Sequence, residues 1–352
     1  MERVLVCLLA STRAHQLTFP SFKRHVLDEL NADLALALTI DENYDYTNRL
    51  WQHARYRWTA PVYSDYGDAY DLAQQWLCQQ YNIPAPDWRQ MLRIEGIWQG
   101  GIFSADPQPS ASSILPFCRW LLLNGLQQDA ILDRYDRFII TRSDFVWLCP
   151  HPPLSILDRH GIWLPDGEDH GGLNDRHLVA SRADVVNCLN MLEDILLHPV
   201  QLYEEMKHHP APPNLKNDEL FLAYHFKRKG LLDKVKRFPY VMYTARPAND
   251  ESPTWQRGRY EPAVHHYVKY EQEFRAANSY ATIIRCRADW ENGAWMKFVP
   301  SLTTSRSVSR LRRLRNDSES AYFWLRSALR RPGRVMRLVR FCKRALPPSV
   351  NK

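Results

Sequence analysis

Residues 3–41, RVLVCLLASTRAHQLTFPSFKRHVLDELNADLALALTID, decide the fold class of this chain. An apolar run is followed by a segment with apolar residues at helical spacing, and then by a second apolar run. The pattern predicts strand, helix, strand, and the near-continuous apolar character of both strands is typical of a sheet buried on both faces. Such alternation favours a parallel sheet with crossover helices. The turn Ser11–Arg13 then lies at the carboxyl end of the first strand, where open α/β sheets bind ligands.

The remaining segments continue this alternation, with residues 43–109 the hardest to assign. Helical patterns predict helices at 68–80, 110–126, 183–197 and 218–229. Apolar runs predict a central strand at 135–148 and shorter strands at 161–165 and 178–182. We find no internal repeat, so the sequence predicts one mixed α/β domain.

The composition adds a basic appendage to this domain. Of 352 residues, 45% are hydrophobic, and 12 Trp, 17 Tyr and 13 Phe argue against a disordered chain. The net charge of +7 is unevenly distributed, because residues 306–352 hold fourteen Lys or Arg and two acidic residues, a net charge of +12 that leaves −5 for the rest. We therefore expect the main domain at 1–300 and a basic amphipathic helical tail at 301–352.

Several classes of protein are disfavoured because their motifs are missing. Seven scattered cysteines without a CxxC pair indicate neither a disulfide framework nor a zinc site, and they fit a reducing cytoplasm. The first apolar run is too short for a signal peptide or a transmembrane helix. The absence of GxSxG, GxGxxG and GxxxxGK[ST] motifs lowers the hydrolase, dehydrogenase and P-loop kinase interpretations.

The segment YDRFIITRSDFVWLC, residues 135–149, places Arg142, Ser143 and Asp144 between two apolar runs. Whether the runs form one strand or two abutting strands, the polar triplet is expected at the ligand-facing edge of the sheet. Asp144 could coordinate a divalent cation or accept a hydrogen bond from a sugar hydroxyl, and Arg142 could pair with phosphate or orient Asp144. A salt bridge at a strand end, without chemistry, is the alternative.

A second candidate site is the loop in LPDGEDHGGLNDRHLVASR, residues 164–182. Its glycines allow positive backbone dihedrals and close approach of a ligand. A solvated acidic turn would explain the same composition, but two adjacent glycines among carboxylates and a guanidinium more often shape a site. The polar side chains of this loop are Asp166, Glu168, Asp169, His170, Asn174, Asp175 and Arg176. Further along, Asn217 or Asp218 is expected to cap the helix that follows.

Taken together, these segments resemble the GT-A-type nucleotide-sugar glycosyltransferases of bacterial surface polysaccharide synthesis. The resemblance covers roughly residues 3–245 and rests on the order of RVLVCLLASTR, SFKRHVLDEL, YDRFIITRSDF, GGLNDRHLVASR and NDELFLAYHFKRKGL. In that family a strand ends in Asp-x-Asp. Here Arg142-Ser143-Asp144 stands in its place, and the chain contains no Asp-x-Asp.

The resemblance implies a fold and a donor site. The fold would be a GT-A-like, Rossmann-type, mostly parallel sheet flanked by helices, and the activity would be transfer of a sugar from a nucleotide-sugar donor. Asp144 would be the metal or ribose ligand, with Mn²⁺ or Mg²⁺ held against the donor diphosphate, or Arg142 would supply the positive charge directly. Ser11 and Arg13 would lie near the nucleotide or its diphosphate. Asn174 and Arg176 complete this predicted donor-binding set.

The resemblance also places the Gly-bearing loop near the acceptor and the donor sugar. An inverting transferase needs a carboxylate that takes the proton of the acceptor hydroxyl. Asp169 is the first candidate for that base, followed by Glu168 or Asp175. A retaining enzyme would need no such base, and the sequence leaves both outcomes open.

The basic tail suggests where the protein works. Arginines interleaved with apolar residues, among them Trp324, Leu338 and Phe341, are typical of a helix that lies on an anionic membrane. We expect a cytoplasmic protein, peripheral on the inner face of the membrane, with a glycan or lipid-linked acceptor. Nucleic acid is not the expected partner, and a helix packed on the main domain would also explain the pattern. The rival interpretation is a non-catalytic, degenerate transferase domain that acts as a binding or scaffold protein through its tail.

Overall fold

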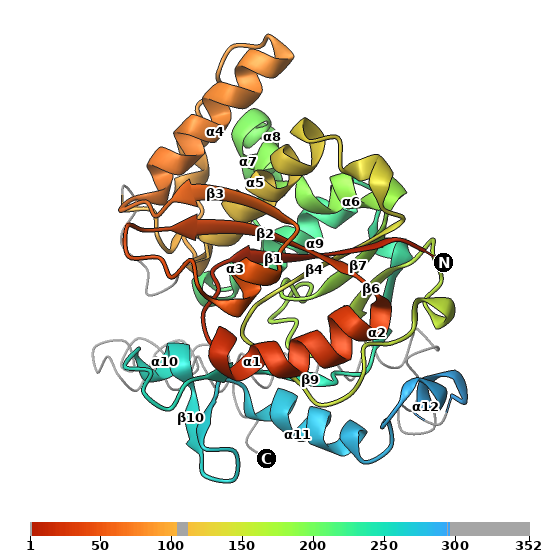
Figure 1. Ribbon diagram of the computed structural model, residues 1–352. Helices are drawn as coiled ribbons and strands as arrows, with labels where there is room; N and C mark the ends of the chain where they lie inside the picture. The colour runs from red at the N-terminus through yellow and green to blue at the C-terminus, as the bar shows by residue number, and fades with distance from the viewer. Residues whose placement is uncertain (1, 104–111, 294, 296–352) are drawn as a thin grey trace, which may run out of the picture. The chain divides into compact units, whose positions relative to one another are not determined.

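The computed structural model describes residues 2–103, 112–293 and 295 of the chain (Figure 1). Its strands are β1 (Val4–Ala10), β2 (Asp33–Ile40), β3 (Tyr56–Pro61), β4 (Arg137–Thr141), β5 (Phe145–Trp147), β6 (Ile162–Pro165), β7 (Leu178–Ser181), β8 (Val235–Phe238), β9 (Met242–Arg246), β10 (Arg259–Glu261) and β11 (His266–Val268). Its helices are α1 (His15–Phe22), α2 (Asp28–Leu30), α3 (Arg49–His53), α4 (Tyr66–Tyr81), α5 (Ile114–Gln128), α6 (Arg182–Leu189), α7 (Met191–Leu197), α8 (Pro199–Met206), α9 (Asp218–Arg228), α10 (Thr254–Arg257), α11 (Glu271–Ala281) and α12 (Arg287–Glu291).

A twisted seven-stranded sheet in the order β3-β2-β1-β4-β7-β6-β8 runs through the centre of the described residues (Figure 1). β1 pairs in parallel with β2 and β4, and β2 pairs in parallel with β3. β7 runs antiparallel to both of its neighbours, whereas β6 and β8 pair in parallel. The expected α/β class, with a mostly parallel sheet flanked by helices, is confirmed.

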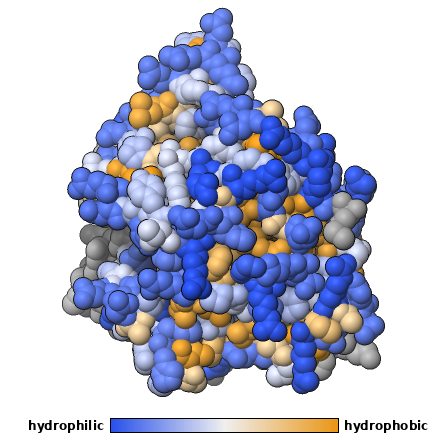
Figure 2. Space-filling view, in the orientation of Figure 1, coloured by the Kyte–Doolittle hydropathy of each residue, from blue (hydrophilic) through white to orange (hydrophobic). Residues whose placement is uncertain are grey.

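Both faces of this sheet are covered, which explains the continuous apolar runs in its strands. Along β1, Leu5, Cys7 and Leu9 enter one core with residues of α4–α9, among them the buried helix α5. Val4, Val6 and Leu8 enter a second core with residues of α1–α3 and β5. On the face drawn in Figure 2, hydrophilic residues predominate and hydrophobic residues gather near the centre and the lower part.

A smaller antiparallel sheet, in the order β10-β11-β9-β5, contributes residues of β5 and β9 to the second core. β5 follows β4 after only three residues but pairs with β9 instead of a strand of the large sheet. The expected strand 135–148 is therefore wrong as a single strand, because Arg142–Asp144 turn the chain from one sheet into the other. The alternative of two abutting strands is correct.

Most other predicted elements are confirmed, with local corrections. The helix expected at 183–197 is interrupted at Asn190, where α6 ends and α7 begins. The helix expected from residue 110 begins at Ile114, so Pro116 lies in its first turn, where proline is tolerated. Asn217 caps α9, because its Oδ1 accepts a hydrogen bond from Leu220 N (3.0 Å). β3 and α3 lie in the segment that was hardest to assign.

The predicted tail at 301–352 lies outside the described residues, as do its expected amphipathic helix and membrane contacts. Among the helices of the described part of the chain, none is both long enough and apolar enough to cross a membrane.

Candidate functional site

The carboxyl ends of β1 and β4 meet at the point where the strand order of the large sheet changes direction. From β1 the chain continues to β2 and β3 on one side, whereas β4 lies on the other side. This topological switch point is where open α/β sheets bind ligands. The turns after the two strands are tied together, because the hydroxyl of Ser143 donates to Ser11 O (2.7 Å), with Arg13 O at 3.1 Å. The predicted residues Ser11, Arg13, Arg142 and Asp144 therefore lie together.

The backbone at this edge is held in conformations that L-residues rarely adopt. Ala10 and Ala14, which flank the turn Ser11–Arg13, have φ of 73° and 58°. Glu168 and His170, in the Gly-bearing loop, have φ of 52° and 43°. Such residues cost free energy and are concentrated at functional sites. The turn Ser11–Arg13 and the Gly-bearing loop therefore both carry backbone strain.

Asp144 lies beneath the turn and is only 1% exposed. Arg142 donates to both of its oxygens, with Nε–Oδ1 of 3.0 Å and Nη2–Oδ2 of 2.7 Å, and Arg246 Nη1 donates to Oδ2 (2.6 Å). Burial opposes the charged carboxylate, but the guanidinium groups of Arg142, Arg246 and Arg13 outweigh it and hold the pKa of Asp144 far below its usual range. Asp144 therefore orients two arginines.

This geometry does not fit a divalent cation, for which Asp144 was the predicted ligand. Mg²⁺ and Mn²⁺ bind carboxylate oxygens that are free to coordinate them. Both oxygens of Asp144 already accept hydrogen bonds from guanidinium groups. Among residues 2–103, 112–293 and 295, moreover, no group of three or more His, Cys, Asp or Glu side chains could hold a metal ion.

Two cations at the switch point have no carboxylate partner among the described residues. Arg13 is exposed and donates through Nε to Ser11 Oγ (3.0 Å), and although its charge acts on Asp144, no carboxylate of the described residues lies within ion-pair distance of it. Lys269, just after β11, contacts the face of Tyr270 at 4.9 Å, and its Nζ forms neither a hydrogen bond nor an ion pair with any of the residues that the structure describes. Burial and the positive charges of Arg142, Arg246 and Arg176 lower the pKa of Lys269 to about 7. The site thus combines two arginines that share one buried carboxylate with two basic groups that have no ion-pair partner among the described residues.

The Gly-bearing loop packs tightly against the start of α9. A Cβ added at Gly172 would lie 1.9 Å from Glu219 O, so only glycine fits there. Asn174 stabilises the loop from within, because its side chain donates to Gly167 O (2.9 Å) and its backbone N–H donates to Asp169 Oδ1 (3.0 Å). The side chain of Asn174 is fully buried and shapes the loop, and its contact with the donor stays a prediction.

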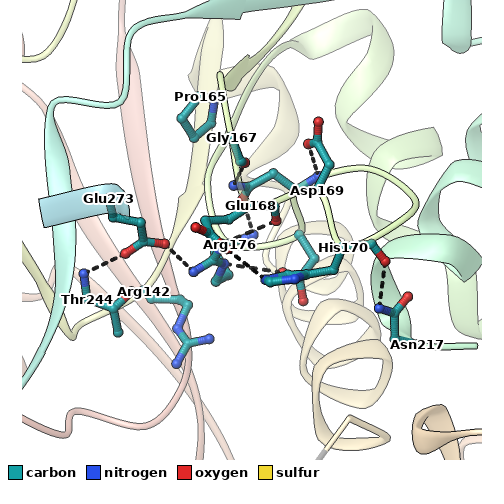
Figure 3. Close-up of polar contacts among 12 residues, drawn as sticks. Arg142, Pro165, Gly167, Glu168, Asp169, His170, Arg176, Asn217, Thr244 and Glu273 are labelled. Carbon is teal, nitrogen blue, oxygen red and sulfur yellow. Dashed lines mark hydrogen bonds and ion pairs between the residues drawn. The ribbon is translucent and has the colours of Figure 1, made fainter. Parts of the chain in front are cut away.

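Arg176 is buried behind the loop and joins it to the smaller sheet. Figure 3 shows Glu273 between Arg176 and the backbone N–H of Thr244, which donates to Glu273 Oε2 (2.8 Å). Arg176 also stacks on Tyr270, with 4.6 Å from its guanidinium carbon to the ring centre. The guanidinium of Arg176, predicted to bind the donor, is therefore largely occupied by protein groups.

The structure separates the three carboxylates predicted as candidate bases. Asp169, the first candidate, forms a two-pronged ion pair with Arg237 on β8, with N–O distances of 2.8 and 3.0 Å. Glu168 Oε2 lies 3.2 Å from Nε2 of His170, whose pKa burial and Arg176 lower to about 4. Asp175 is 8% exposed, and its Oδ1 accepts no hydrogen bond from described residues. Asp175 and Glu168 therefore remain better placed than Asp169 to exchange a proton.

Glu219, in the first turn of α9, was not predicted and lies near Asp175. Burial and the charge of Asp175 raise the pKa of Glu219 to about 8. The adjacent Asp218 is buried, and its pKa is raised well above the usual value for the same two reasons. The pKa of a general base or acid is commonly tuned toward neutral pH in this way. Glu219 thus joins the candidates for proton transfer.

Sequence reasoning missed Arg246, Lys269, Tyr270 and Glu273 as well as Glu219. Arg246 ends the apolar segment YVMYTAR, so a strand followed by a charged residue was the available signal. The other three lie in the segment YVKYEQE, where charged and aromatic residues alternate without a recognisable motif. Pairing between the short strands β5, β9 and β11 brings this segment to the switch point.

No protein-family model and no curated protein matches the chain. Solved structures similar to it include mouse xyloside xylosyltransferase 1 in its apo form, with 9% sequence identity and a TM-score of 0.35 over 68% of this chain and 86% of that one. They also include a protein of Desulfovibrio desulfuricans G20 with the provisional name nucleotide-diphospho-sugar transferase, with 11% identity and a TM-score of 0.29 over 68% of this chain and 80% of that one. Both similarities are distant.

Proposed function

We propose that this chain is a glycosyltransferase that moves a sugar from a nucleotide-sugar donor to a glycan or lipid-linked acceptor. The observation that carries the proposal is the set of basic groups at the switch point of the large sheet. Arg13 and Lys269 lie there with no carboxylate of the described residues at ion-pair distance, beside the buried pair of Arg142 and Asp144. The diphosphate of a ligand bound at this edge would form ion pairs with these basic groups.

The chemistry asked of these groups is stabilisation of a leaving nucleoside diphosphate. When the bond between the sugar and the diphosphate breaks, negative charge grows on the phosphate oxygens, and fixed cations stabilise it. Arg142 is held in one orientation by two hydrogen bonds to Asp144, so it need not reorganise as that charge develops. The arginines and Lys269 would act where other transferases use a divalent cation.

An acceptor hydroxyl would approach from the Gly-bearing loop. If transfer inverts the sugar, Glu168 or Asp175 takes the proton of that hydroxyl, because Asp169 is engaged by Arg237. Glu219 lies close enough to Asp175 for their charges to interact, and so could share that proton. Retention would leave these carboxylates to position the acceptor.

For the cellular setting we propose surface polysaccharide synthesis at the cytoplasmic face of the membrane. The support is the +12 charge of residues 306–352 and the apolar residues among their arginines. Sedimentation with anionic liposomes tests this part, with the tail-deleted chain as control. Equal recovery of both chains in the supernatant would contradict it.

A second candidate function is a binding or scaffold domain that has lost catalysis. It is favoured by the engagement of both Asp144 oxygens with arginines, since a carboxylate at this position no longer offers a metal ligand. Such a domain would bind nucleotide without cleaving the donor.

Donor cleavage and nucleotide binding together test both functions. Melting temperatures would be measured with a panel of nucleoside diphosphates and nucleotide sugars, in EDTA or Mn²⁺, and release of free nucleotide would be followed in parallel. A ligand at about 100 times its Kd adds roughly 2.7 kcal/mol of stability. We expect a nucleotide-selective shift that persists in EDTA, with slow release of nucleotide.

The matched variants are Arg13→Met, which removes an unpaired cation at the switch point, and Arg24→Met, which removes an exposed arginine elsewhere. Only the first should reduce the shift. A shift without donor cleavage would select the binding function, whereas no shift with any nucleotide would contradict both.

A further inference from the structure

Lys269 reaches the switch point through the smaller sheet. Its N–H donates to Thr244 O (2.9 Å), which extends the pairing of β11 with β9 by one residue beyond Val268 and Ala245. Residues paired across antiparallel strands project from the same face, and so do residues two apart along a strand. Lys269, Thr244 and Arg246 therefore project from one face of the smaller sheet, next to the turn that carries Arg142.

The charges around Lys269 are mostly of its own sign. Arg142 comes from the β4–β5 turn, Arg246 from β9 and Arg176 from the loop before β7, and all three disfavour an ammonium group at this position. Asp144 favours it, but its two oxygens are already engaged by arginines. Tyr270 offers only its ring face. Among the described residues, no carboxylate lies at ion-pair distance from the ammonium group of Lys269, although the charges of Asp144 and Glu219 act on it from farther away.

We propose that Lys269 is a proton-linked binding residue for phosphate: it takes up one proton from solvent as a nucleoside diphosphate binds at the switch point. The amine becomes an ammonium that pairs with a phosphate oxygen, and no covalent bond to the ligand forms or breaks. This inference rests on the proposed function, because it requires an anionic nucleotide at that edge. It adds a specific role for a residue that no motif identifies.

The proposal fixes the direction of the pH dependence. In the free protein the side chain is mainly neutral above its pKa of about 7, whereas a bound phosphate raises that pKa. Binding then requires proton uptake between the two pKa values, and affinity falls as pH rises through that window. With a pKa of about 7 in the free protein, linkage gives a roughly eightfold increase in Kd between pH 7.5 and 8.5.

Other groups that face this region must be separated from Lys269. Glu219 has a pKa raised to about 8 by burial and Asp175, so a bound anion would also favour its protonated form. His170 titrates near pH 4, and burial raises the pKa of Tyr270, so neither titrates between pH 7 and 9. Arg13, Arg142, Arg176 and Arg246 stay charged throughout this range. Glu219 is thus the group to control.

Calorimetric titration of the full chain with UDP and GDP tests the proposal. At pH 8.0, where a terminal phosphate with a second pKa of about 6 has lost its proton, titrations in two buffers of different ionisation enthalpy count the protons taken up. We expect about 0.9 proton per nucleotide from Lys269. The uptake should persist in Glu219→Gln and in Lys227→Met, which removes an exposed lysine of α9.

Lys269→Arg is the decisive variant, because arginine keeps the positive charge at every pH used. It should bind nucleotide without proton uptake and with a Kd that no longer changes between pH 7.5 and 8.5. The Cε resonance of Lys269 provides a second readout, and should titrate near pH 7 in the free protein and above pH 9 with nucleotide.

The outcomes separate this inference from the proposed function. Nucleotide binding without proton uptake, or uptake that is lost in Glu219→Gln and kept in Lys269→Arg, overturns the role of Lys269 and leaves the proposed function standing. A free-protein titration of Lys269 above pH 9.5 overturns it as well. No binding of any nucleoside diphosphate at any pH overturns the proposed function itself.

Discussion

Replacing Asp144 by asparagine should destabilise the protein strongly, because it removes the buried carboxylate that Arg142 and Arg246 share and leaves Arg246 with the more distant carboxylate of Asp250, at 4.0 Å. Asp144 is 1% exposed, and the side chain of Arg246 is 2% exposed, so water cannot replace the lost partner. The amide would also present N–H donors to guanidinium donors. Breaking a buried ion pair by removing one partner costs about 3–5 kcal/mol, and we expect the free energy of unfolding of Asp144→Asn to fall by this amount.

A double-mutant cycle with Arg246→Met shows whether the loss comes from uncompensated charge. Arg246→Met alone leaves Asp144 paired with Arg142 and should cost about 1.5–3 kcal/mol, the range for a hydrogen bond to a charged group. In the double variant only Arg142 lacks a partner, and its side chain is 18% exposed and can be hydrated. The loss of unfolding free energy in the double variant should therefore be smaller than the sum of the losses in the two single variants by about 1–3 kcal/mol.

The assay is denaturant unfolding followed by tryptophan fluorescence at pH 7.5. Asp158→Asn is the matched control, because Asp158 pairs with Lys236 at the surface, where both side chains are more than 40% exposed. An exposed pair of this kind contributes about 0–1 kcal/mol. A loss below about 1 kcal/mol for Asp144→Asn, or full additivity in the cycle, would refute the interpretation of Asp144 as a buried counter-ion.

Three further variants probe other parts of the site and the core. Gly172→Ala places a Cβ 1.9 Å from Glu219 O and should cost about 3 kcal/mol or more in a thermal melt, whereas Gly171→Ala meets open space and should cost about 1 kcal/mol for its positive φ alone. His151→Phe should become about 2 kcal/mol less destabilising, relative to wild type, when the pH falls from 7.5 to 5. Burial lowers the pKa of His151 to about 4, so wild type loses stability as the pH falls below the pKa of histidine in the unfolded state, about 6.5. Equal effects of the variant at both pH values would contradict this prediction. Asp169→Asn should lower the free energy of unfolding and have the smaller effect on the rate of donor cleavage, measured at saturating donor. Glu219→Gln should change the pH profile of that rate. The opposite result for the two variants would indicate that Asp169 is the base.

The central strands were predictable because each of them buries both faces. β1 is apolar along its full length and β2 from Leu34 to Leu38, and the two cores divide these residues by alternation. β3 escaped prediction for the opposite reason, since its residues alternate between half-buried and exposed at the edge of the sheet. The break at Asn190 was also hidden, because apolar residues continue at helical spacing through α6 and α7. Strands could thus be predicted from their apolar runs wherever both faces of the sheet are covered.

The candidate site was predictable only where residues follow a strong strand. Ser11–Arg13 and Arg142–Asp144 directly succeed β1 and β4, so the topology alone brings them together. Arg246 and Lys269 arrive on β9 and β11, strands of five and three residues whose pairing depends on contacts far apart in the sequence. Short strands with distant partners leave no local pattern, and the groups they carry were missed.

Residue type alone is also a poor guide to the roles of the charged side chains, because ion pairs within the protein decide which of these side chains a ligand can reach. Asp144 has the type of a metal ligand but is engaged by Arg142 and Arg246, and Asp169 has the type of a base but is engaged by Arg237. In each case an arginine from a strand distant in the sequence forms an ion pair with the carboxylate, Arg246 with Asp144 and Arg237 with Asp169. Among the described residues at the switch point, Arg13 and Lys269 form no ion pair, and they lie far apart in the sequence, before and after Asp144. In the proposed function, an anion at the switch point would therefore be positioned by the cations that form no ion pair within the described part of the chain.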